Sequence, residues 1–281
     1  GIVFFIASSI IEEGVCSSTH LNRGAKIGLR WKRGPVELMK SLGENEVKRL
    51  ITMVTDQYNV NHPSAIGEKF WEIHTVNLQK KNDMAVITMD QPENMNALSE
   101  ASMHELSEKF DAAERDPHIN TIFITGSGKA FVGGADIKFF VNNIKSNKIC
   151  NIESFTGFGQ QVFNKIDKSS KKVIAVVNGL ALGGGLELAL CADVILAVNK
   201  AQFAFPETGI GIYPGLGGTQ RSVLRIGKGL SKYLIHTGKK LTATEAEEIG
   251  LIDKVISSDE LMDLLSGSGS LPVFKLKVLS E

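Results

Sequence analysis

Two glutamates lie in stretches of the sequence where a charged residue is unusual. Glu187 stands in the apolar segment "NGLALGGGLELAL" (178–190), two residues after three consecutive glycines, and Glu207 follows an apolar run and a proline in "FAFPET" (203–208). Each has a structural explanation, since an acid in the first turn of a helix is stabilised by the helix dipole. As a pair, two carboxylates could hold one water molecule and move protons on and off a substrate carbon.

Glycines gather in three segments, each directly after an apolar, strand-like run. The segments are "FVGGADIK" (131–138), "LGGGLELA" (182–189) and "PETGIGIYPGLGGTQ" (206–220). A strand that turns through glycines into a helix exposes backbone N–H groups that have no partner inside the helix. Two such groups from two loops could form an oxyanion hole, which stabilises negative charge developing on an oxygen. The alternative is that the glycines only form turns and helix-packing sites.

The sequence does not contain the glycine patterns of nucleotide-binding sites or the cysteine and histidine patterns of metal sites and disulfides. "GSGKAF" (126–131) has Phe123 where a P-loop needs its first glycine, and "GGGLEL" and "GLGGTQ" do not fit the GxGxxG pattern of a dinucleotide site. The three cysteines and six histidines show neither metal-ligand spacing nor a disulfide framework. We therefore expect no metal site, no bound NAD and reduced thiols in a cytoplasmic protein.

The composition is that of an ordinary globular protein. Lys and Arg together number 31, as do Asp and Glu, so no overall basic field indicates nucleic acid as a partner. The apolar start "GIVFFIASSII" is too short to span a bilayer, which needs about 20 residues, and lacks the basic region of a secretory signal. We expect a buried helix there and no membrane partner. Because the first residue is not Met, we expect a piece of a longer protein.

Hydrophobic periodicity divides the chain into parts. Residues 1–58 are predicted to be helical, with a clear apolar face in "NEVKRLITMVTDQY", and residues 59–70, rich in turn-forming residues, are predicted to be a linker. From residue 71 onward, "EIHTVNLQ" and "AVITMD" predict a hairpin, followed by a helix from about Leu98. "TIFITG", "KVIAVVNG" and "DVILAV" predict strands that alternate with helices, which indicates an α/β domain. The tail from "SGSGS" onward is predicted to begin as a flexible segment.

The central segments resemble the enoyl-CoA hydratase (crotonase) family. The resemblance is carried by "AFVGGADIK", by "VIAVVNGLALGGGLELALCADVILAVNKAQFAFPETGIGIYPGLGGTQR" and by "LTATEAEEIGLIDKV". It covers about residues 71–257 and leaves residues 258–281 as a C-terminal tail shorter than that of most members. The resemblance implies an α/β fold, a spiral of ββα units, that binds acyl-CoA thioesters. It implies no separate cofactor, since coenzyme A is part of the substrate, and a homo-oligomer, a trimer or hexamer.

The resemblance also implies roles for particular residues. The N–H groups of Ala135 and Gly184 match the oxyanion hole that holds the thioester oxygen of the enolate, and Glu187 and Glu207 match the two glutamates of the hydratases. Glu187 would take the proton of the water that adds at Cβ, and Glu207 would supply the proton at Cα. The product would be a 3-hydroxyacyl-CoA, made from a trans-2-enoyl-CoA in fatty-acid oxidation.

Coenzyme A contacts are implied for two short segments, "MNAL" (95–98) and "ADIK" (135–138). The residues concerned are Ala97 in the first segment and Ala135, Asp136, Ile137 and Lys138 in the second, together with Gly184 of the glycine segment 182–189. The family often has a basic residue just before "NAL", whereas this chain has "PENMNAL" with Glu93.

The N-terminal part has a second, shorter resemblance. "EEGVCSSTHLNRGAKIGLRWKRGPVELM" (12–39) is similar to the C-terminal helical domain of 3-hydroxyacyl-CoA dehydrogenases, which some fatty-acid-oxidation proteins carry fused to a hydratase. Residues 1–58 would then be a remnant of that domain, without the Rossmann site that binds NAD.

Three alternatives to a hydratase remain open at this level. The same scaffold could isomerise a double bond or hydrolyse a thioester, although both glutamates are present here. An RNA-binding homologue would use a lysine-rich helix, whereas the matching helix "SEASMHELSEKFDAAERD" is rich in acids. An inactive remnant with a short C-terminus is the third.

Overall fold

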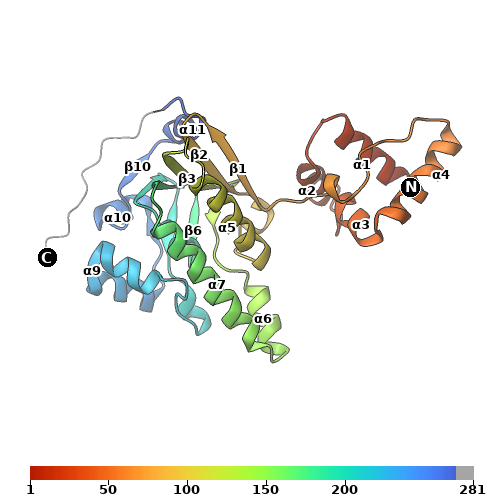
Figure 1. Cartoon of the computed structure of the whole chain (residues 1–281). Coiled ribbons are helices and arrows are strands. Elements are labelled where there is room, and N and C mark those ends of the chain that lie inside the picture. Colours follow the sequence, from red (N-terminus) through yellow and green to blue (C-terminus); the bar gives the residue numbers. More distant parts are fainter. Residues whose placement is uncertain (270–281) are drawn as a thin grey trace. The chain divides into compact units, whose positions relative to one another are not determined.

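The computed structural model describes residues 1–269, which form two compact units. The first consists of Gly1–His74 and the second begins at Thr75 (Figure 1). Each unit has its own cluster of buried apolar side chains.

Residues 1–74 form a helical unit, which takes in the predicted helical residues 1–58 and also residues 59–74. Its four α-helices and one short 3₁₀-helix are α1 (Ile2–Glu12), α2 (Ser18–Gly28), α3 (Pro35–Leu42), α4 (Glu44–Tyr58) and η1 (Glu68–Phe70). Val47 and Ile51 of α4 pack with Met39 of α3 and with Trp71, each fully or almost fully buried. The predicted apolar face of α4 is therefore the face that fills this core.

The helix at the chain start is only partly the buried helix that we expected. Phe4 and Ala7 of α1 pack into the core of the first unit, but Ile2 and Ile6 are 53% and 50% exposed. The prediction of a buried helix therefore holds only for the side of α1 that packs into the core of this unit. No helix within residues 1–269 is long and apolar enough to cross a membrane.

The second unit is built on a large mixed sheet. Within residues 75–269, six strands pair in the order β1-β2-β3-β5-β7-β10. They are β1 (Val76–Lys81), β2 (Met84–Met89), β3 (Thr121–Gly126), β5 (Lys172–Val177), β7 (Val194–Val198) and β10 (Lys254–Ile256). The predicted hairpin is the antiparallel pair β1–β2, and every other pair in this sheet is parallel.

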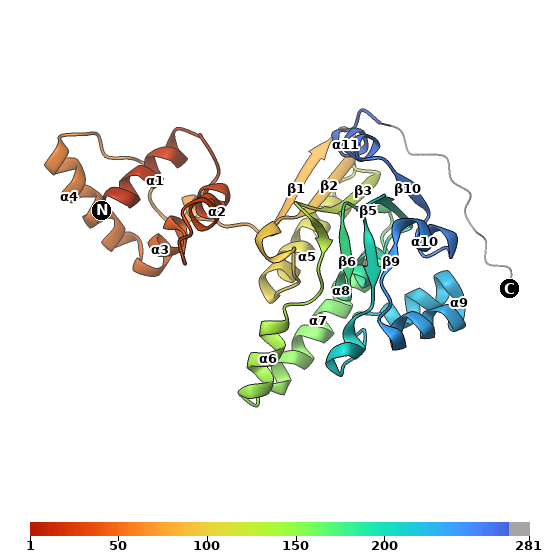
Figure 2. The same ribbon diagram turned by 180° about the vertical axis from the view of Figure 1, so that it is seen from behind.

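A smaller sheet lies in the same unit, and its strands alternate along the chain with those of the large sheet. Its order is β4-β6-β8-β9, and the strands are β4 (Ala130–Val132), β6 (Leu180–Leu182), β8 (Gln202–Ala204) and β9 (Leu241–Thr242). β3 leads into β4, β5 into β6 and β7 into β8, and each pair is followed by helix. Three successive ββα turns therefore confirm the predicted spiral (Figure 2).

Helices complete each turn of the spiral. They are α5 (Glu100–Glu114), α6 (Ile137–Lys145), α7 (Ile149–Asp167), α8 (Gly184–Ala189), α9 (Gly218–Thr237), α10 (Ala243–Glu248) and α11 (Ser258–Ser266), with the 3₁₀-helices η2 (Pro92–Asn94) and η3 (Glu207–Ile210). α10 opens with a capping box, in which Thr242 accepts the Glu245 N–H and Glu245 accepts the Thr242 N–H. The predicted flexible tail falls mainly on residues 270–281, which lie outside the described residues.

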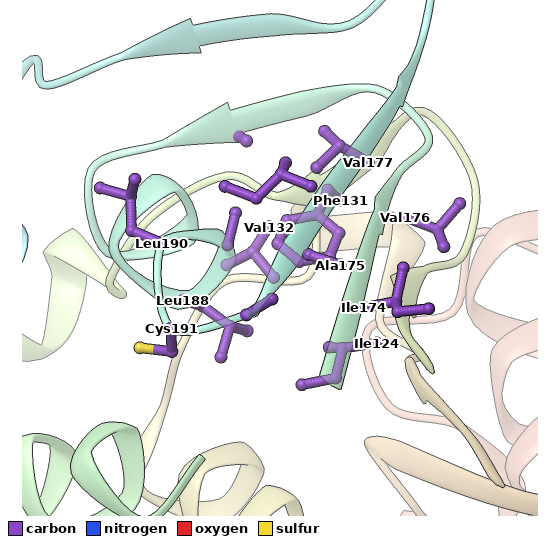
Figure 3. Packing of buried hydrophobic residues seen from close by; sticks show 14 of the residues in the cluster. Ile124, Phe131, Val132, Ile174, Ala175, Val176, Val177, Leu188, Leu190 and Cys191 are labelled. Atoms are coloured by element: carbon purple, nitrogen blue, oxygen red, sulfur yellow. The ribbon is translucent and has the colours of Figure 1, made fainter. Parts of the chain in front are cut away.

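Apolar side chains from both sheets and from the short helix α8 form one core. Ala175 and Val177 of β5 lie on the side of the strand that faces Phe131 of β4 and Leu188 of α8, and all four are at most 1% exposed (Figure 3). β5 and β7 are almost continuous runs of buried apolar residues, as expected for strands covered on both faces. α8 is thereby held rigidly at the centre of the unit.

The small sheet brings the three glycine segments together. β4, β6 and β8 are parallel neighbours, with Val132 opposite Ala181 and Leu182 opposite Ala204. The chain leaves all three strands at the same edge of the sheet. In parallel sheets, ligands bind beyond the carboxyl ends of the strands. "GGAD", "GGGLE" and "PETG" therefore begin side by side.

Candidate active site

The turn from β6 into α8 depends on Gly183. This residue has φ +51°, a left-handed conformation, and its N–H donates to the Ala204 carbonyl at 2.9 Å, which ties the turn to the end of β8. Gly184 then begins α8, so its N–H belongs to the first helical turn and has no partner within the helix. The turn also places Glu187 one helical turn later, inside the core.

The second exposed amide comes from the turn after β4. Leu98 donates its N–H to the Gly134 carbonyl and accepts the N–H of Asp136, so the intervening Ala135 N–H points away from this bridge. A Cβ atom at Gly184 would lie 3.8 Å from the Ala135 nitrogen. The structure thus brings together Ala135 and Gly184, the two residues from which an oxyanion hole was predicted.

Glu187 is buried and firmly held. The residue belongs to α8 and is only 2% exposed. Its Oε1 atom accepts the N–H of Leu216 at 2.7 Å and that of Gly218 at 2.8 Å. A Cβ atom at Gly218 would lie 2.7 Å from Glu187 Cγ, so only glycine leaves room for this approach. Two amides in one loop therefore fix the carboxylate in position.

Glu207 lies in η3, which follows β8 directly. The residue is 9% exposed, and its Oε2 atom is buried without a hydrogen-bond partner among the described residues. Its other oxygen packs against the glycine turn, since a Cβ atom at Gly183 would come within 2.7 Å of Glu207 Oε1. A buried polar atom without a partner is costly in a folded protein unless a ligand or water satisfies it.

Burial shifts the acidity of both carboxyl groups. It raises the pKa of Glu187 from 4.5 to about 7, although the N–H groups of Gly218 and Leu216 and the charge of Arg221 act in the opposite direction. Burial also raises the pKa of Glu207 to about 7; its own backbone N–H lowers it and the nearby charge of Glu187 raises it further. Two interacting groups near neutral pH suit proton transfer at that pH.

The residues predicted to contact coenzyme A lie around the same edge. Ala97, half-buried, precedes Leu98 of the bridge, and Asp136 caps α6 by accepting the Lys138 N–H at 2.9 Å. Ile137 and Lys138 are exposed at the start of α6. They are therefore near Ala135 in the chain and accessible, while their contact with coenzyme A stays a prediction.

Asn96 was not among the predicted residues, although it stands inside "MNAL". It is 1% exposed, and its Nδ2 group donates to the carbonyls of Ala130 and Phe131 at 2.9 and 3.1 Å. Gly133 in turn donates its N–H to the Met95 carbonyl. Asn96 thus fastens the 95–98 segment to β4 and to the turn that presents Ala135. An Asn in a turn can be suspected from sequence, but the carbonyls that accept from its Nδ2 group lie more than thirty residues away.

Among residues 1–269, no group of three or more His, Cys, Asp or Glu side chains could hold a metal ion. Cys191, one turn after Glu187, donates its thiol to the Glu187 carbonyl, and burial raises the pKa of this thiol. It is packed as a small apolar residue.

Comparison with known proteins supports this architecture. Residues 79–266 match the model of the enoyl-CoA hydratase/isomerase family. The chain belongs to this family. The matched part lies entirely within the second unit, and the helical first unit precedes it.

Similar proteins from bacteria match the same part of the chain. The crotonyl-CoA hydratase of Syntrophomonas wolfei is 43% identical over 186 residues, which cover 66% of this chain and 70% of the relative. The short-chain-enoyl-CoA hydratase of Clostridium acetobutylicum is 40% identical over 195 residues, covering 68% and 72%.

Solved structures of family members show the same fold. The enoyl-CoA hydratase of Bacillus anthracis superimposes with a TM-score of 0.64 at 31% identity, covering 69% of this chain and 74% of the other. That of Thermoplasma volcanium gives a TM-score of 0.63 at 35% identity, covering 70% and 78%.

Proposed function

We propose that Glu187 and Glu207 hydrate a trans-2-enoyl-CoA thioester at the edge of the small sheet. The chain is an enoyl-CoA hydratase, a hydro-lyase that adds water across the 2,3 double bond and gives a 3-hydroxyacyl-CoA. The observation that carries the assignment of the two roles is the contrast between the carboxyl groups. Glu187 Oε1 is saturated by two amides, whereas Glu207 Oε2 is buried and unpartnered.

The first step is addition of water at Cβ. One water molecule lies between the two carboxyl groups, and ionised Glu187 accepts its proton while the oxygen bonds to Cβ. The electron pair of the double bond moves into the thioester, and the resulting enolate oxygen accepts hydrogen bonds from the N–H groups of Ala135 and Gly184. Losing one such donor typically lowers the rate about 10²–10³-fold.

The second step places a proton on Cα. Glu207, protonated in the resting enzyme, gives its proton to Cα as the enolate collapses. After one turnover Glu187 is therefore protonated and Glu207 is ionised. Proton exchange with solvent restores the starting state. The raised pKa of each group, about 7, supports a pair that shares one proton at neutral pH.

The rest of the predicted setting is proposed on the same basis. Ala97, Asp136, Ile137 and Lys138 would contact coenzyme A. No cofactor or metal takes part in the mechanism, and the protein would act as a cytoplasmic homo-oligomer, a trimer or hexamer, in fatty-acid oxidation.

The first unit is proposed to be a remnant of a 3-hydroxyacyl-CoA dehydrogenase domain. It has a core of its own and lies outside the matched residues 79–266, as expected for a separate module.

Crotonyl-CoA hydration tests the proposed activity. The conjugated double bond absorbs in the ultraviolet, so hydration by the full chain is followed as loss of that absorbance, with the 3-hydroxyacyl product identified by mass. A panel of longer enoyl-CoAs then gives the chain-length preference. Isomerisation or thioester hydrolysis without hydration would overturn the proposal, and each is distinguished by its product.

A further inference from the structure

The 216–218 loop, which donates two hydrogen bonds to Glu187, is itself fixed by hydrogen bonds from Arg221. Leu216 and Gly218 point their N–H groups at Glu187 Oε1, and the carbonyl groups of the same loop face the other way. The Leu216 carbonyl accepts a hydrogen bond from Arg221 Nη1 at 2.9 Å, and the Gly217 carbonyl accepts the Arg221 backbone N–H at 3.0 Å. Arg221, in the first turn of α9, therefore donates hydrogen bonds to the carbonyls of Leu216 and Gly217, the two peptide groups between the Leu216 N–H and the Gly218 N–H.

The guanidinium of Arg221 is buried and anchored on another element. Its side chain is 9% exposed, Nη2 donates to Asn164 Oδ1 at 2.7 Å, and Nε lies 3.3 Å from Asp167 Oδ2. Nε is not aligned for a hydrogen bond with that carboxylate, so the Asp167 contact is an ion pair only. Both partners belong to the last turn of α7. The anchoring chain runs from α7 through Arg221 to the loop and ends at Glu187.

We propose that Arg221 is a positioning residue for the hydration reaction: it fixes the 216–218 loop so that its two amides hold Glu187 in line with the water. Arg221 does not touch substrate in this scheme. It acts through the Leu216 carbonyl, and α7 serves as its support. The inference rests on the proposed function and adds a residue outside the glutamate pair and the oxyanion hole.

A planar guanidinium is suited to this role. Nη1 and Nη2 reach the Leu216 carbonyl and Asn164 at the same time, which a lysine ammonium on a flexible stem cannot reproduce. A displacement of about 1 Å at a reacting group can cost about 10²-fold in rate, so loss of the grip is expected to affect turnover.

Arg221 also places a positive charge near Glu187. The charged and titratable groups that interact with this site are Arg221 on α9, Glu207 on η3, Cys191 after α8 and Asp167 on α7. Of these, the charge of Arg221 lowers the pKa of Glu187. Removing that charge will therefore raise the pH at which Glu187 becomes ionised.

Arg225 provides a matched control on the same helix. It lies four residues further along α9 and pairs with Asp253 at 2.8 Å, with a second hydrogen bond to the Ala192 carbonyl at 3.3 Å. It is partly buried and charge-paired like Arg221, but its ion pair and hydrogen bonds go to Ala192, Asp193 and Asp253 and not to the 216–218 loop. Arg225→Met therefore measures what the loss of a partly buried, ion-paired arginine on α9 does to the fold alone.

The test measures kcat, KM and the pH dependence of crotonyl-CoA hydration for Arg221→Met, Arg221→Lys, Asn164→Ala and Arg225→Met. We expect Arg221→Met to lower kcat about 10–100-fold with a smaller change in KM, and to move the acid limb of the pH profile to higher pH. Arg221→Lys keeps the charge, so its acid limb stays in place while kcat falls. Asn164→Ala lowers kcat less, and Arg225→Met leaves kcat and both limbs unchanged.

Two results would overturn the proposal. One is a folded Arg221→Met protein whose kcat and acid limb equal those of wild type. The other applies if Arg221→Met does not fold: wild-type kcat in both Arg221→Lys and Asn164→Ala would then exclude a positioning role. Wild-type protein without hydratase activity would instead contradict the proposed function, so the two failures are distinguishable.

Discussion

Glu187 and Glu207 are both buried, both have a pKa raised to about 7, and yet they are held in opposite ways. Glu187 sits within α8, and one of its oxygens accepts two amides from a loop 29 and 31 residues away. Glu207 sits in a short 3₁₀ turn, with one oxygen against the Gly183 turn and the other without a partner.

The contrast teaches how one site can assign different tasks to two chemically identical groups. A carboxylate whose orientation is fixed by two donors can take a proton from one defined direction. A carboxyl group with a bare oxygen can bind water or substrate and give up a proton without breaking a protein hydrogen bond. The environments rather than the residue type separate the two roles.

Replacing each glutamate by glutamine gives the largest expected effect and tests this separation directly. Glu187→Gln and Glu207→Gln should each lower kcat for hydration by about 10²–10⁴-fold, because each removes a proton acceptor or donor. The double variant should lose much less than the product of the two factors, because the groups act as a unit.

Deuterium exchange at Cα of a saturated acyl-CoA distinguishes the two single variants, since in this exchange ionised Glu207 removes the Cα proton and then returns a deuteron, and no water attacks. Glu207→Gln should lose it and Glu187→Gln should keep it. Equal loss in both would contradict the assignment of roles.

The glycines beside the two carboxyl groups offer a smaller perturbation. Gly218→Ala would push a methyl group to 2.7 Å from Glu187 Cγ, and Gly183→Ala would combine a φ of +51° with an approach of 2.7 Å to Glu207 Oε1. We expect either change to lower kcat about 10–100-fold by displacing the neighbouring carboxyl group. Gly209→Ala is the control, since nothing lies within 4 Å of its added methyl group. Wild-type turnover in Gly218→Ala would show that the position of Glu187 is not critical.

The pH dependence of kcat/KM should be bell-shaped around neutral pH. Only the singly protonated pair is active in the proposed mechanism, and both groups have a pKa raised to about 7. Below the lower apparent pKa both are protonated, and above the upper one both are ionised, so activity falls about tenfold per pH unit on each side. Rate profiles from pH 5 to 9 check this, and a flat profile through that range would contradict a shared proton.

The smallest expected effect is that of Glu187→Gln on the free energy of unfolding, and its direction depends on pH. Because the pKa of Glu187 rises from 4.5 to about 7 on folding, the folded protein binds more protons than the unfolded one between these values. The contribution of this group to stability is full below pH 4.5 and is lost as the pH rises through about 7. Glu187→Gln can still accept both amide bonds, so it should be more stable than wild type at pH 8, by about 1–3 kcal/mol, and not at pH 4.5. Urea unfolding at the two pH values measures the difference, and an equal effect at both would argue against ionisation as its cause.

Local patterns predicted much of the fold and part of the site. The β1–β2 hairpin, α5 and the strands β3, β5 and β7 follow from periodicity, because each element buries its apolar positions in the expected register. Gly184, Glu187 and Glu207 could be singled out because glycine and charge are costly in their local settings. The prediction of a buried helix at α1 holds on one side only, because a composition of apolar residues does not say how many neighbours are present to cover them.

What could not be predicted are contacts between distant segments. The amides of Leu216 and Gly218, the grip of Arg221 on their loop and the bonds of Asn96 all join residues whose types are ordinary in their own surroundings. Only the three-dimensional arrangement shows that an arginine in "GGTQR" faces a carbonyl rather than solvent.

The position of Trp71 in the core of the first unit has a consequence for spectroscopy. The chain has two tryptophans, Trp31 and Trp71, and both belong to residues 1–74. Intrinsic tryptophan emission therefore reports the melting of the helical unit and carries no chromophore from the catalytic one. A single tryptophan placed at Tyr213, which is 74% exposed beside the glutamate-holding loop, would give the catalytic unit an optical signal of its own.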